Sequence, residues 1–365
     1  IELSERLISI APSGMTKAFF LNSGSEAIDT AIKFAWYYNN GRGLRDKKKI
    51  ISRLRGYHGV TVAGGSLTAI PLMQNDFDLP LDRMKQTDTP NFYRFGEADE
   101  SEEAFSTRLA NSLEQLILQE GPETVAAFVA EPVMGAGGVI LPPATYFQKI
   151  QVVLDKYDIL LVADEVICGF GRTGNMWGCN TYDIRPDMVT CAKQLSSGYL
   201  PISAVMISEK IYDVFKEQSR KHGAFGMGYT YGGHPVSCAV ALETLKIYEE
   251  RDMIGHVQSV APHFLERLSE LSDSSIVGEA RGVGLIAALE LVSDKSSRAQ
   301  FSPDAKAAPA IAASALARGL VVRALPGDVI GICPPLIIEN TQVDELFDKL
   351  AAAVTETEAL LRKAA

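Results

Sequence analysis

The 365-residue sequence predicts an α/β protein with two parts, a large domain built on a mainly parallel sheet and a smaller α+β domain. From about residue 14 to residue 248, short β-branched and apolar runs alternate with segments of helical period, which is typical of a sheet covered on both faces. Beyond residue 250 strands and helices no longer alternate in this way, as in α+β domains. A chain of this length usually divides into two domains.

The elements can be placed in order along the chain. An amphipathic helix is expected over residues 3–8, and the run 19–21 ends a strand that leads through a small-residue turn into a helix. Further strands are expected at 50–51, 125–130, 159–163, 188–192 and 204–207, and helices at 146–157 and 236–250. In the last part, strands at 282–291 and 320–323 flank a helix at 303–318, and a final helix covers 343–361. We expect residues 1–13 to form a helix that packs with the smaller domain, residues 14–255 to form the large domain, and residues 256–365 the smaller one.

Composition limits the class of protein. Apolar residues make up 47% and charged residues 22%, as in ordinary soluble globular proteins. A net charge of −10 without a basic stripe argues against a nucleic-acid partner, and no apolar run approaches the roughly 20 residues of a membrane span. Five cysteines without a Cys-x-x-Cys spacing indicate a reduced, cytoplasmic protein, and the five histidines form no metal-binding pattern. Because the sequence begins at Ile1 rather than methionine, we expect the natural protein to begin earlier.

Two of the predicted strands end in a single charge, Asp164 and Lys193, 29 positions apart. That spacing leaves room for one crossover, which would place both charges at the edge of the sheet where parallel α/β proteins bind ligands. Lys193 has apolar, small and hydroxylated neighbours, and burial would lower its pKa and make it a candidate imine-forming amine. Asp164 could keep a pyridine nitrogen protonated while Val166 packs under the ring, and Glu165 would face elsewhere in a structural role. The pair suggests a pyridoxal phosphate enzyme.

The turn Ser23-Gly24-Ser25 lies between a predicted strand and a predicted helix. Its backbone N–H groups, hydroxyls and helix dipole would suit a phosphate. The alternative is an ordinary capping box, with Ser23 as the N-cap and Glu26 three positions later.

Two other strand ends carry candidate residues. Tyr57-His58-Gly59 could stack an aromatic ring on a flat heterocycle, or it could be a turn with a packed tyrosine, and His58 could relay protons or be structural. Glu131 precedes a glycine-rich loop and either points into the same cleft as Asp164 or is a loop carboxylate.

Together these segments resemble, in family order, the class III aminotransferases that use pyridoxal phosphate, the fold-type I group that includes the omega-aminotransferases. The resemblance covers nearly the whole chain and implies roles for nine residues. Ser23, Gly24 and Ser25 would hold the cofactor phosphate. Tyr57 would stack on the ring and border the substrate, with His58 and Glu131 near the cofactor. Asp164 would pair with the pyridine nitrogen, Val166 would pack on the other face, and Lys193 would form the Schiff base.

The resemblance also implies a homodimer and a substrate site. Thr230, in residues 228–235, is similar to a threonine that reaches the phosphate of the neighbouring subunit, so the active sites would be shared. Arg323 is similar to the arginine that clamps a substrate carboxylate in the pyruvate-using branch, a task that suits the guanidinium fork. Arg172 is its rival, although it belongs to a turn motif found across the family. Family members usually carry a further N-terminal segment that lines the substrate pocket, and it is absent from this sequence.

We therefore expect a transaminase that moves an amino group from an amine, omega-amino acid or amino acid to an oxo acid such as pyruvate, with ping-pong kinetics. Within the same family, a decarboxylase, racemase or aminomutase would share the cofactor residues. A truncated, non-catalytic relative is another alternative. A nicotinamide-dependent oxidoreductase would rest on Gly282-Val283-Gly284, which lacks a third glycine in register.

Overall fold

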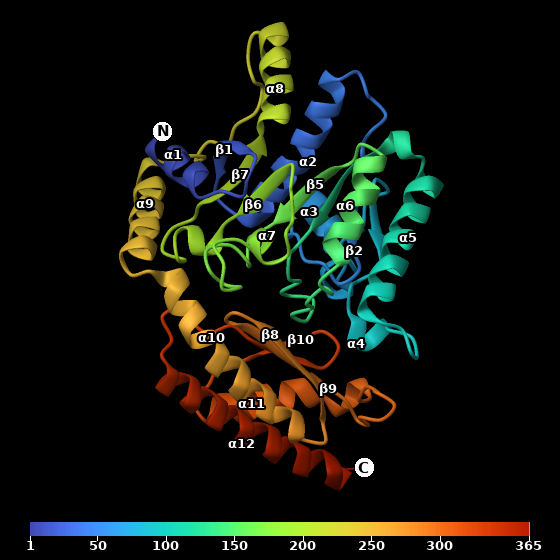
Figure 1. Ribbon diagram of the computed structural model, residues 1–365, viewed down its shortest axis with the longest axis vertical. Helices are drawn as coiled ribbons and strands as arrows, with labels where there is room; N and C mark the ends of the chain where they lie inside the picture. The colour runs from blue at the N-terminus through green and yellow to red at the C-terminus, as the bar shows by residue number, and fades with distance from the viewer. Residues whose placement is uncertain (365) are drawn as a thin grey trace.

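The computed structural model describes residues 1–364 and contains two sheets (Figure 1). The large sheet has seven strands in the order β1-β7-β6-β5-β4-β2-β3. All neighbours from β6 to β3 are parallel, and β7 runs antiparallel to both β6 and β1. The predicted mainly parallel sheet is therefore confirmed. Its strands are β1 (Met15–Leu21), β2 (Lys49–Arg53), β3 (Met84–Thr87), β4 (Val125–Ala130), β5 (Leu160–Asp164), β6 (Met188–Cys191) and β7 (Ser203–Ser208).

Both faces of this sheet are covered by helices, because its central strands are apolar on both sides. Alternate residues such as Ile50, Val129 and Val162 pack in one core with α2 (Gly24–Gly41) and α8 (Glu209–His222). Their strand neighbours, such as Phe128 and Leu161, pack in another core with α5 (Glu102–Glu120) and α6 (Tyr146–Lys156). The remaining helices of the large domain, apart from the N-terminal one, are α3 (Val62–Leu67), α4 (Phe92–Phe95), α7 (Gly178–Thr181) and α9 (Pro235–Glu250).

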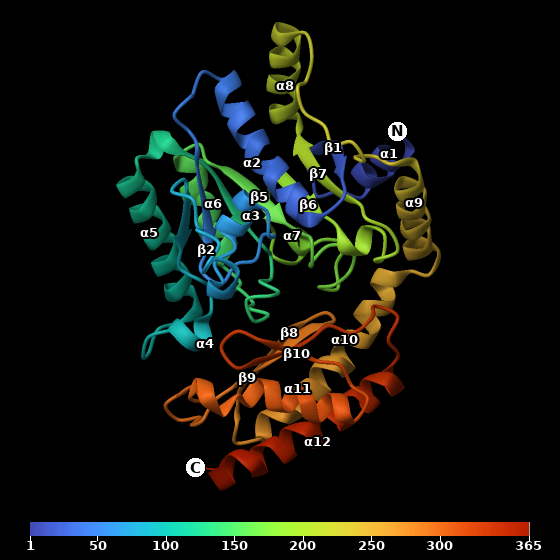
Figure 2. The same cartoon turned by 180° about the vertical axis from the view of Figure 1, so that it is seen from behind.

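The smaller sheet has four antiparallel strands in the order β10-β11-β9-β8. Its strands are β8 (Val277–Val283), β9 (Ile286–Leu291), β10 (Arg323–Leu325) and β11 (Val329–Ile332). Helices α10 (Met253–Glu270), α11 (Ala307–Ala317) and α12 (Asn340–Ala364) cover the face that is turned away from the large domain (Figure 2). The sheet itself therefore faces the large domain.

Three predicted elements differ in detail. The run 282–291 is not one strand but the end of β8 and all of β9, because Gly284 takes a left-handed φ of +57° and turns the chain. Of residues 320–323 only Arg323 belongs to a strand. The helix expected at 303–318 is a short 3₁₀ turn followed by α11, since Lys306 has a φ of +48° and separates the two.

The N-terminal helix α1 (Glu2–Ser9) packs against β1 and α9, on the side of the large sheet (Figures 1 and 2). Leu3 and Leu7 are buried there, Arg6 pairs with Glu249 of α9, and the Trp177 indole donates to the Ile10 carbonyl at 2.5 Å. The prediction that residues 1–13 pack with the smaller domain is therefore wrong, because the buried face of the helix meets the large domain instead. The boundary at residues 255 and 256 stays a prediction, since α10 carries the chain from one sheet to the other.

Among residues 1–364, no helix has the length and apolar character needed to cross a bilayer.

Candidate active site

A cavity of about 420 Å³ lies at the carboxyl ends of β4, β5 and β6, and we call it the cofactor cavity. Asp164 is the last residue of β5, and Lys193 comes two positions after the end of β6. These strands are parallel neighbours with Asp164 opposite Thr190, so both charges reach the same edge. Nine residues that the sequence singled out line this cavity: Ser23, Gly24, Ser25, Tyr57, His58, Glu131, Asp164, Val166 and Lys193.

The Asp164 carboxylate is held in one orientation. It is 4% exposed, and its Oδ2 lies 2.8 Å from Nδ1 of the buried His58. Its Oδ1 accepts hydrogen bonds from the Thr190 hydroxyl at 3.1 Å and from the Val166 N–H at 3.2 Å. His58 therefore acts on Asp164, and its position behind the carboxylate supports an orienting role.

Lys193 is accessible from the cavity but surrounded by protein on its other sides. This partial desolvation lowers the pKa of its ammonium, although Asp164 and Glu131 act in the opposite direction. Its backbone has a left-handed φ of +42°, a conformation that costs energy and is found mainly at functional sites. The Tyr248 hydroxyl donates to the Gln194 carbonyl at 2.9 Å and ties this turn to α9. The turn thus presents a lysine that loses its proton more readily than an ordinary lysine does.

The turn before α2 is a capping box, and it also leaves backbone N–H groups without a partner within the helix. Ser23 is the N-cap and accepts from the Glu26 N–H at 3.2 Å, while the Glu26 carboxylate accepts from the backbone and side chain of Asn22. The N–H groups of Gly24 and Ser25 fall in the first turn, where a helix has no acceptor of its own for them. A Cβ at Gly24 would lie 3.1 Å from Val166 Cγ1, so glycine keeps this wall of the cavity open. The helix start therefore remains available to an anion.

Glu131 organises the loops beside Asp164. It is 3% exposed and accepts from the Tyr57 N–H at 3.0 Å and from the Gly135 N–H at 2.9 Å, and burial raises its pKa. Its own carbonyl accepts from the buried Arg53 guanidinium at 2.5 Å. Glu131 lines the cavity and also holds the Tyr57 backbone, so both readings of this residue have support.

Two charged residues that compete with the proposed ones have structural partners. Glu165 faces away from the cavity and accepts from the N–H groups of Gly178 at 2.9 Å and Cys179 at 2.6 Å, and burial raises its pKa to about 7. Arg172 is buried and donates to the carbonyls of Leu285 at 2.9 Å and Pro334 at 2.6 Å. Arg172 is thus occupied in joining the two domains, which favours Arg323 as the substrate arginine.

A second cavity of about 890 Å³ opens beside the first, and we call it the outer cavity. It shares Ile167, Lys193 and Gly198 with the cofactor cavity, and its far side carries Arg323 at the start of β10. Arg323 is exposed, and its charge also lowers the pKa of Lys193. A negatively charged substrate group in the outer cavity could therefore pair with the Arg323 guanidinium.

The structure does not bring Thr230 into either cavity of the single chain. Thr230 is exposed on the segment between α8 and α9. Its predicted role requires a second copy of the chain and remains a prediction.

Sequence reasoning missed three residues that support the site. Thr190 binds Asp164 and could have been found from the parallel register, since it lies three positions before Lys193. Arg53, at the end of β2, and Tyr248, in α9, act through backbone carbonyls, and no local pattern marks such contacts.

The glycines at 282 and 284 do not bind a nucleotide. They lie at the turn of an antiparallel hairpin, whereas a dinucleotide site needs them between a strand and a helix. A Cβ at Gly284 would come within 2.6 Å of the Arg172 carbonyl oxygen, so this glycine allows close packing between the domains. The nicotinamide alternative therefore does not fit.

A buried carboxylate and a lysine at neighbouring strand ends, beside the N-terminus of a helix, define a fold-type I pyridoxal phosphate enzyme. The donors fit that cofactor: an acid for its pyridine nitrogen, an amine for its carbonyl and free N–H groups for its phosphate.

The comparisons with known proteins agree. The family model described as class-III aminotransferase matches residues 1–354, and the chain belongs to this family of pyridoxal phosphate-dependent aminotransferases. A Solanum lycopersicum protein named gamma aminobutyrate transaminase 3, chloroplastic, is 53% identical over 359 residues, which are 98% of this chain and 69% of that protein. The crystal structure of the omega transaminase from Pseudomonas jessenii in complex with PMP is 50% identical, with a TM-score of 0.97, and the match covers 99% of this chain and 79% of that one. A structure titled transaminase with L-ala is 53% identical, with a TM-score of 0.96, and the match covers 99% and 85%.

Proposed function

We propose that this aminotransferase moves an amino group from a small amine, omega-amino acid or amino acid to an oxo acid such as pyruvate. One observation carries the proposal: Arg323 lines the same cavity as Lys193 and is exposed, whereas Arg172, which also lines this cavity, is buried and donates to two backbone carbonyls. A guanidinium binds a carboxylate through two parallel hydrogen bonds, and a long side chain at a strand start can turn aside for an apolar amine. The names of the relatives, which include gamma-aminobutyrate and omega transaminases, support substrates of this size.

Different residues of the cofactor cavity would hold the phosphate, the ring and the pyridine nitrogen of the cofactor. Gly24 and Ser25 would donate N–H groups to the phosphate, helped by the positive end of the α2 dipole. Tyr57 and Val166 would enclose the ring, and Asp164 would hold a proton on the pyridine nitrogen. When bound, pyridoxal phosphate supplies an electrophilic carbonyl and an electron-accepting ring.

Lys193 would carry out the proton transfer. Its neutral Nζ can take a proton from the substrate carbon, because burial lowers the pKa of this amine and so raises the neutral fraction at a given pH. His58 would keep Asp164 oriented through the 2.8 Å contact between its Nδ1 and Asp164 Oδ2. Asp164 could then keep the pyridine nitrogen protonated.

Two further features are proposals of the same kind. Thr230 would complete the phosphate site of a second copy, which makes the enzyme a homodimer with shared active sites. A cytoplasmic location is consistent with five free cysteines, whereas the names of the plant relatives place those proteins in chloroplasts or mitochondria.

The half-reactions test the function. Protein loaded with pyridoxal phosphate would be mixed with a panel of amines, omega-amino acids and amino acids, and its absorption spectrum followed. We expect a shift to the pyridoxamine phosphate spectrum, reversal by pyruvate, and formation of alanine. Carbon dioxide release or substrate racemisation without alanine formation would contradict transamination in favour of a related reaction.

A further inference from the structure

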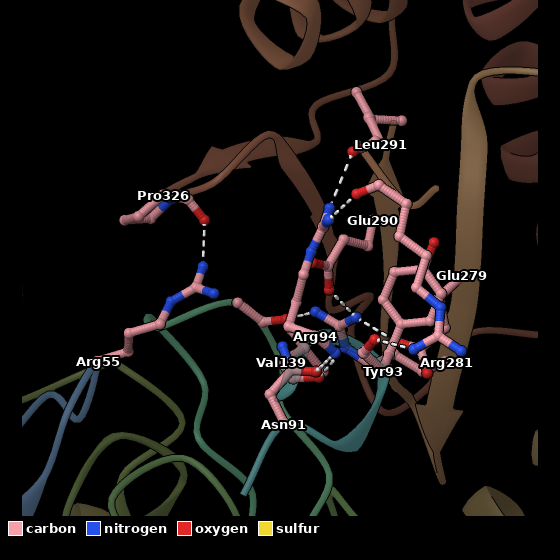
Figure 3. Close-up of polar contacts among 12 residues, drawn as sticks. Arg55, Asn91, Tyr93, Arg94, Val139, Glu279, Arg281, Glu290, Leu291 and Pro326 are labelled. Atoms are coloured by element: carbon pink, nitrogen blue, oxygen red, sulfur yellow. Dashed lines mark hydrogen bonds and ion pairs between the residues drawn. The ribbon is translucent and has the colours of Figure 1, made fainter. Parts of the chain in front are cut away.

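A buried cluster of charged residues joins the small sheet to the large domain (Figure 3). Glu290 of β9 has no exposed surface and forms ion pairs with Arg94, from α4 of the large domain, and with Arg281 of β8. Both arginine side chains are 9% exposed. Arg281 also pairs with Glu279 at 2.5 Å. We call Arg94, Arg281 and Glu290 the interdomain cluster.

The cluster reaches the cofactor cavity through a glycine-rich loop. The Arg281 guanidinium donates to the carbonyls of Gly138 at 2.6 Å and Val139 at 2.8 Å. The Val139 N–H donates to the Gly135 carbonyl at 3.0 Å, and the Gly135 N–H donates to Glu131 at 2.9 Å. Because Glu131 also accepts from the Tyr57 N–H, these hydrogen bonds connect the small sheet to the wall of the cofactor cavity.

A second hydrogen bond connects the small domain to the chain just before Tyr57. The Arg55 side chain, two positions before Tyr57, donates to the Pro326 carbonyl at 2.6 Å in the β10–β11 turn (Figure 3). The next residue, Gly327, has a φ of +82°, and a Cβ there would lie 2.8 Å from the Arg55 guanidinium. The left-handed φ favours glycine at this position, and a larger residue would also require the Arg55 side chain to move.

The register of the small sheet connects Arg323, on the edge strand β10, to the interdomain cluster. Glu290 is opposite Val329 of β11, and Val329 is opposite Leu325 of β10. Arg323 lies two residues before Leu325 on the same strand and on the same face. A movement of β9 relative to the large domain would therefore move Arg323 relative to Lys193.

We propose that the interdomain cluster is a specificity-determining positioning device, which sets how far Arg323 stands from Lys193 and so the affinity for carboxylate substrates. This inference rests on the proposed function of Arg323. Without the Glu290 charge, the buried Arg94 would lose its carboxylate partner and Arg281 would keep only Glu279, and the small sheet would shift away from the loop at Gly138. Apolar amines, which do not use Arg323, would be affected much less.

A purely stabilising role fits the cluster poorly. Buried ion pairs contribute little net stability, because desolvation offsets their attraction, but they favour one arrangement of the groups they join. The same small domain has a second network on its outer face, where Arg267 pairs with Asp344 at 2.5 Å and Asp348 at 2.8 Å. That network joins α10 to α12, and Arg267, Asp344 and Asp348 line neither cavity, so it provides a control within the same domain.

The test compares Glu290→Gln with Arg267→Gln in the full-length holoenzyme. We expect Glu290→Gln to raise KM for pyruvate by about 5- to 30-fold, the range of coupling between connected sites, while KM for an uncharged aryl amine changes by no more than about twofold. Arg267→Gln should leave both KM values within about twofold of the wild type. In the cofactor-free protein, Glu290→Gln should also speed hydrogen exchange at residues 135–139, which reports the shift without any turnover.

The double variant Glu290→Gln/Arg323→Ala and the single variant Arg323→Ala distinguish failure of this inference from failure of the proposed function of Arg323. If Glu290 acts through Arg323, Glu290→Gln should add nothing to KM for pyruvate in the Arg323→Ala background. Additive effects, or an unchanged KM in Glu290→Gln, would overturn the inference. If Arg323→Ala alone leaves KM for pyruvate unchanged, the proposed function of Arg323 fails instead.

If Glu290→Gln does not fold, Arg281→Lys replaces it. That variant keeps the charge beside Glu290 but loses the fork that reaches the Gly138 and Val139 carbonyls. We expect the same pattern with a smaller rise in KM for pyruvate, and an equal rise for the aryl amine would contradict the inference.

Discussion

The cofactor cavity and the outer cavity meet at Lys193 but are built differently. The cofactor cavity is lined by strand ends and the turns that follow them, all within the large domain. The outer cavity lies between the two sheets, with Arg323 on a short strand of the smaller one. Cofactor chemistry therefore depends on local connections, whereas recognition of a carboxylate depends on how the domains are held together. Variants in the two cavities should have different effects.

The largest effect is expected from Lys193→Ala. It removes the only amine that the two cavities share, so turnover and the borohydride-reducible adduct should both be lost. Lys216→Ala, on the exposed face of α8, is the control and should keep normal rates. Normal turnover by Lys193→Ala would remove the basis for placing the chemistry at this site.

Asp164→Asn should come next, with a loss in kcat on the order of 10²–10³-fold, the usual effect of removing one electrostatic partner of the reacting group. The amide keeps the shape but cannot hold a proton on the pyridine nitrogen, so pyruvate and amine half-reactions should slow together. Glu165→Gln is the matched control, because it changes an equally buried neighbouring carboxylate that faces away from the cavity. Equal losses in the two variants would show that burial, not the contact with the ring, explains the effect.

Arg323→Ala should weaken substrate binding in the outer cavity without affecting cofactor binding. KM for pyruvate should rise by about 10- to 100-fold, corresponding to the roughly 1.5–3 kcal/mol of a charged hydrogen bond, while affinity for pyridoxal phosphate stays unchanged. The control is Arg318→Ala, near the end of α11, which contacts Glu356 on the outer side of the small domain. A loss of cofactor affinity in Arg323→Ala would contradict the assignment of cofactor binding to one cavity and carboxylate recognition to the other.

The smallest effect concerns pH and stability. Since the folded-state pKa of Lys193 lies below its ordinary 10.5, its charged form is disfavoured on folding. This cost is fully present below the lowered pKa and disappears as the pH rises to 10.5. In the cofactor-free protein, Lys193→Met should therefore melt a few °C higher than the wild type at neutral pH, and the difference should shrink toward pH 10.5. A difference that is constant from pH 7 to 10.5 would contradict the lowered pKa.

The two cavities also differ in how far the sequence could predict them. Asp164, Lys193 and the turn at Gly24 were found because a charge or a small residue at the end of a buried strand leaves a local signal. Arg323 and Lys193 line the same cavity because the two sheets pack together, and no local sequence pattern records that packing.

The same reason explains what was missed in the fold. The pairing of Arg94 with Glu290 joins residues 196 positions apart, and each alone reads as a surface charge. The amphipathic helix at residues 3–8 was expected, but its apolar face fits either domain equally well from the sequence alone. The run 282–291 lacked a polar turn signal, so only the left-handed Gly284 divides it.

The central claim is that Lys193 is the amine that holds the cofactor. The most direct measurement is to load the protein with pyridoxal phosphate, reduce it with borohydride, digest it and find the phosphopyridoxyl group by mass spectrometry. The structure predicts one labelled peptide, modified at Lys193. A label on another lysine, or no label on a protein that still turns over, would contradict the claim.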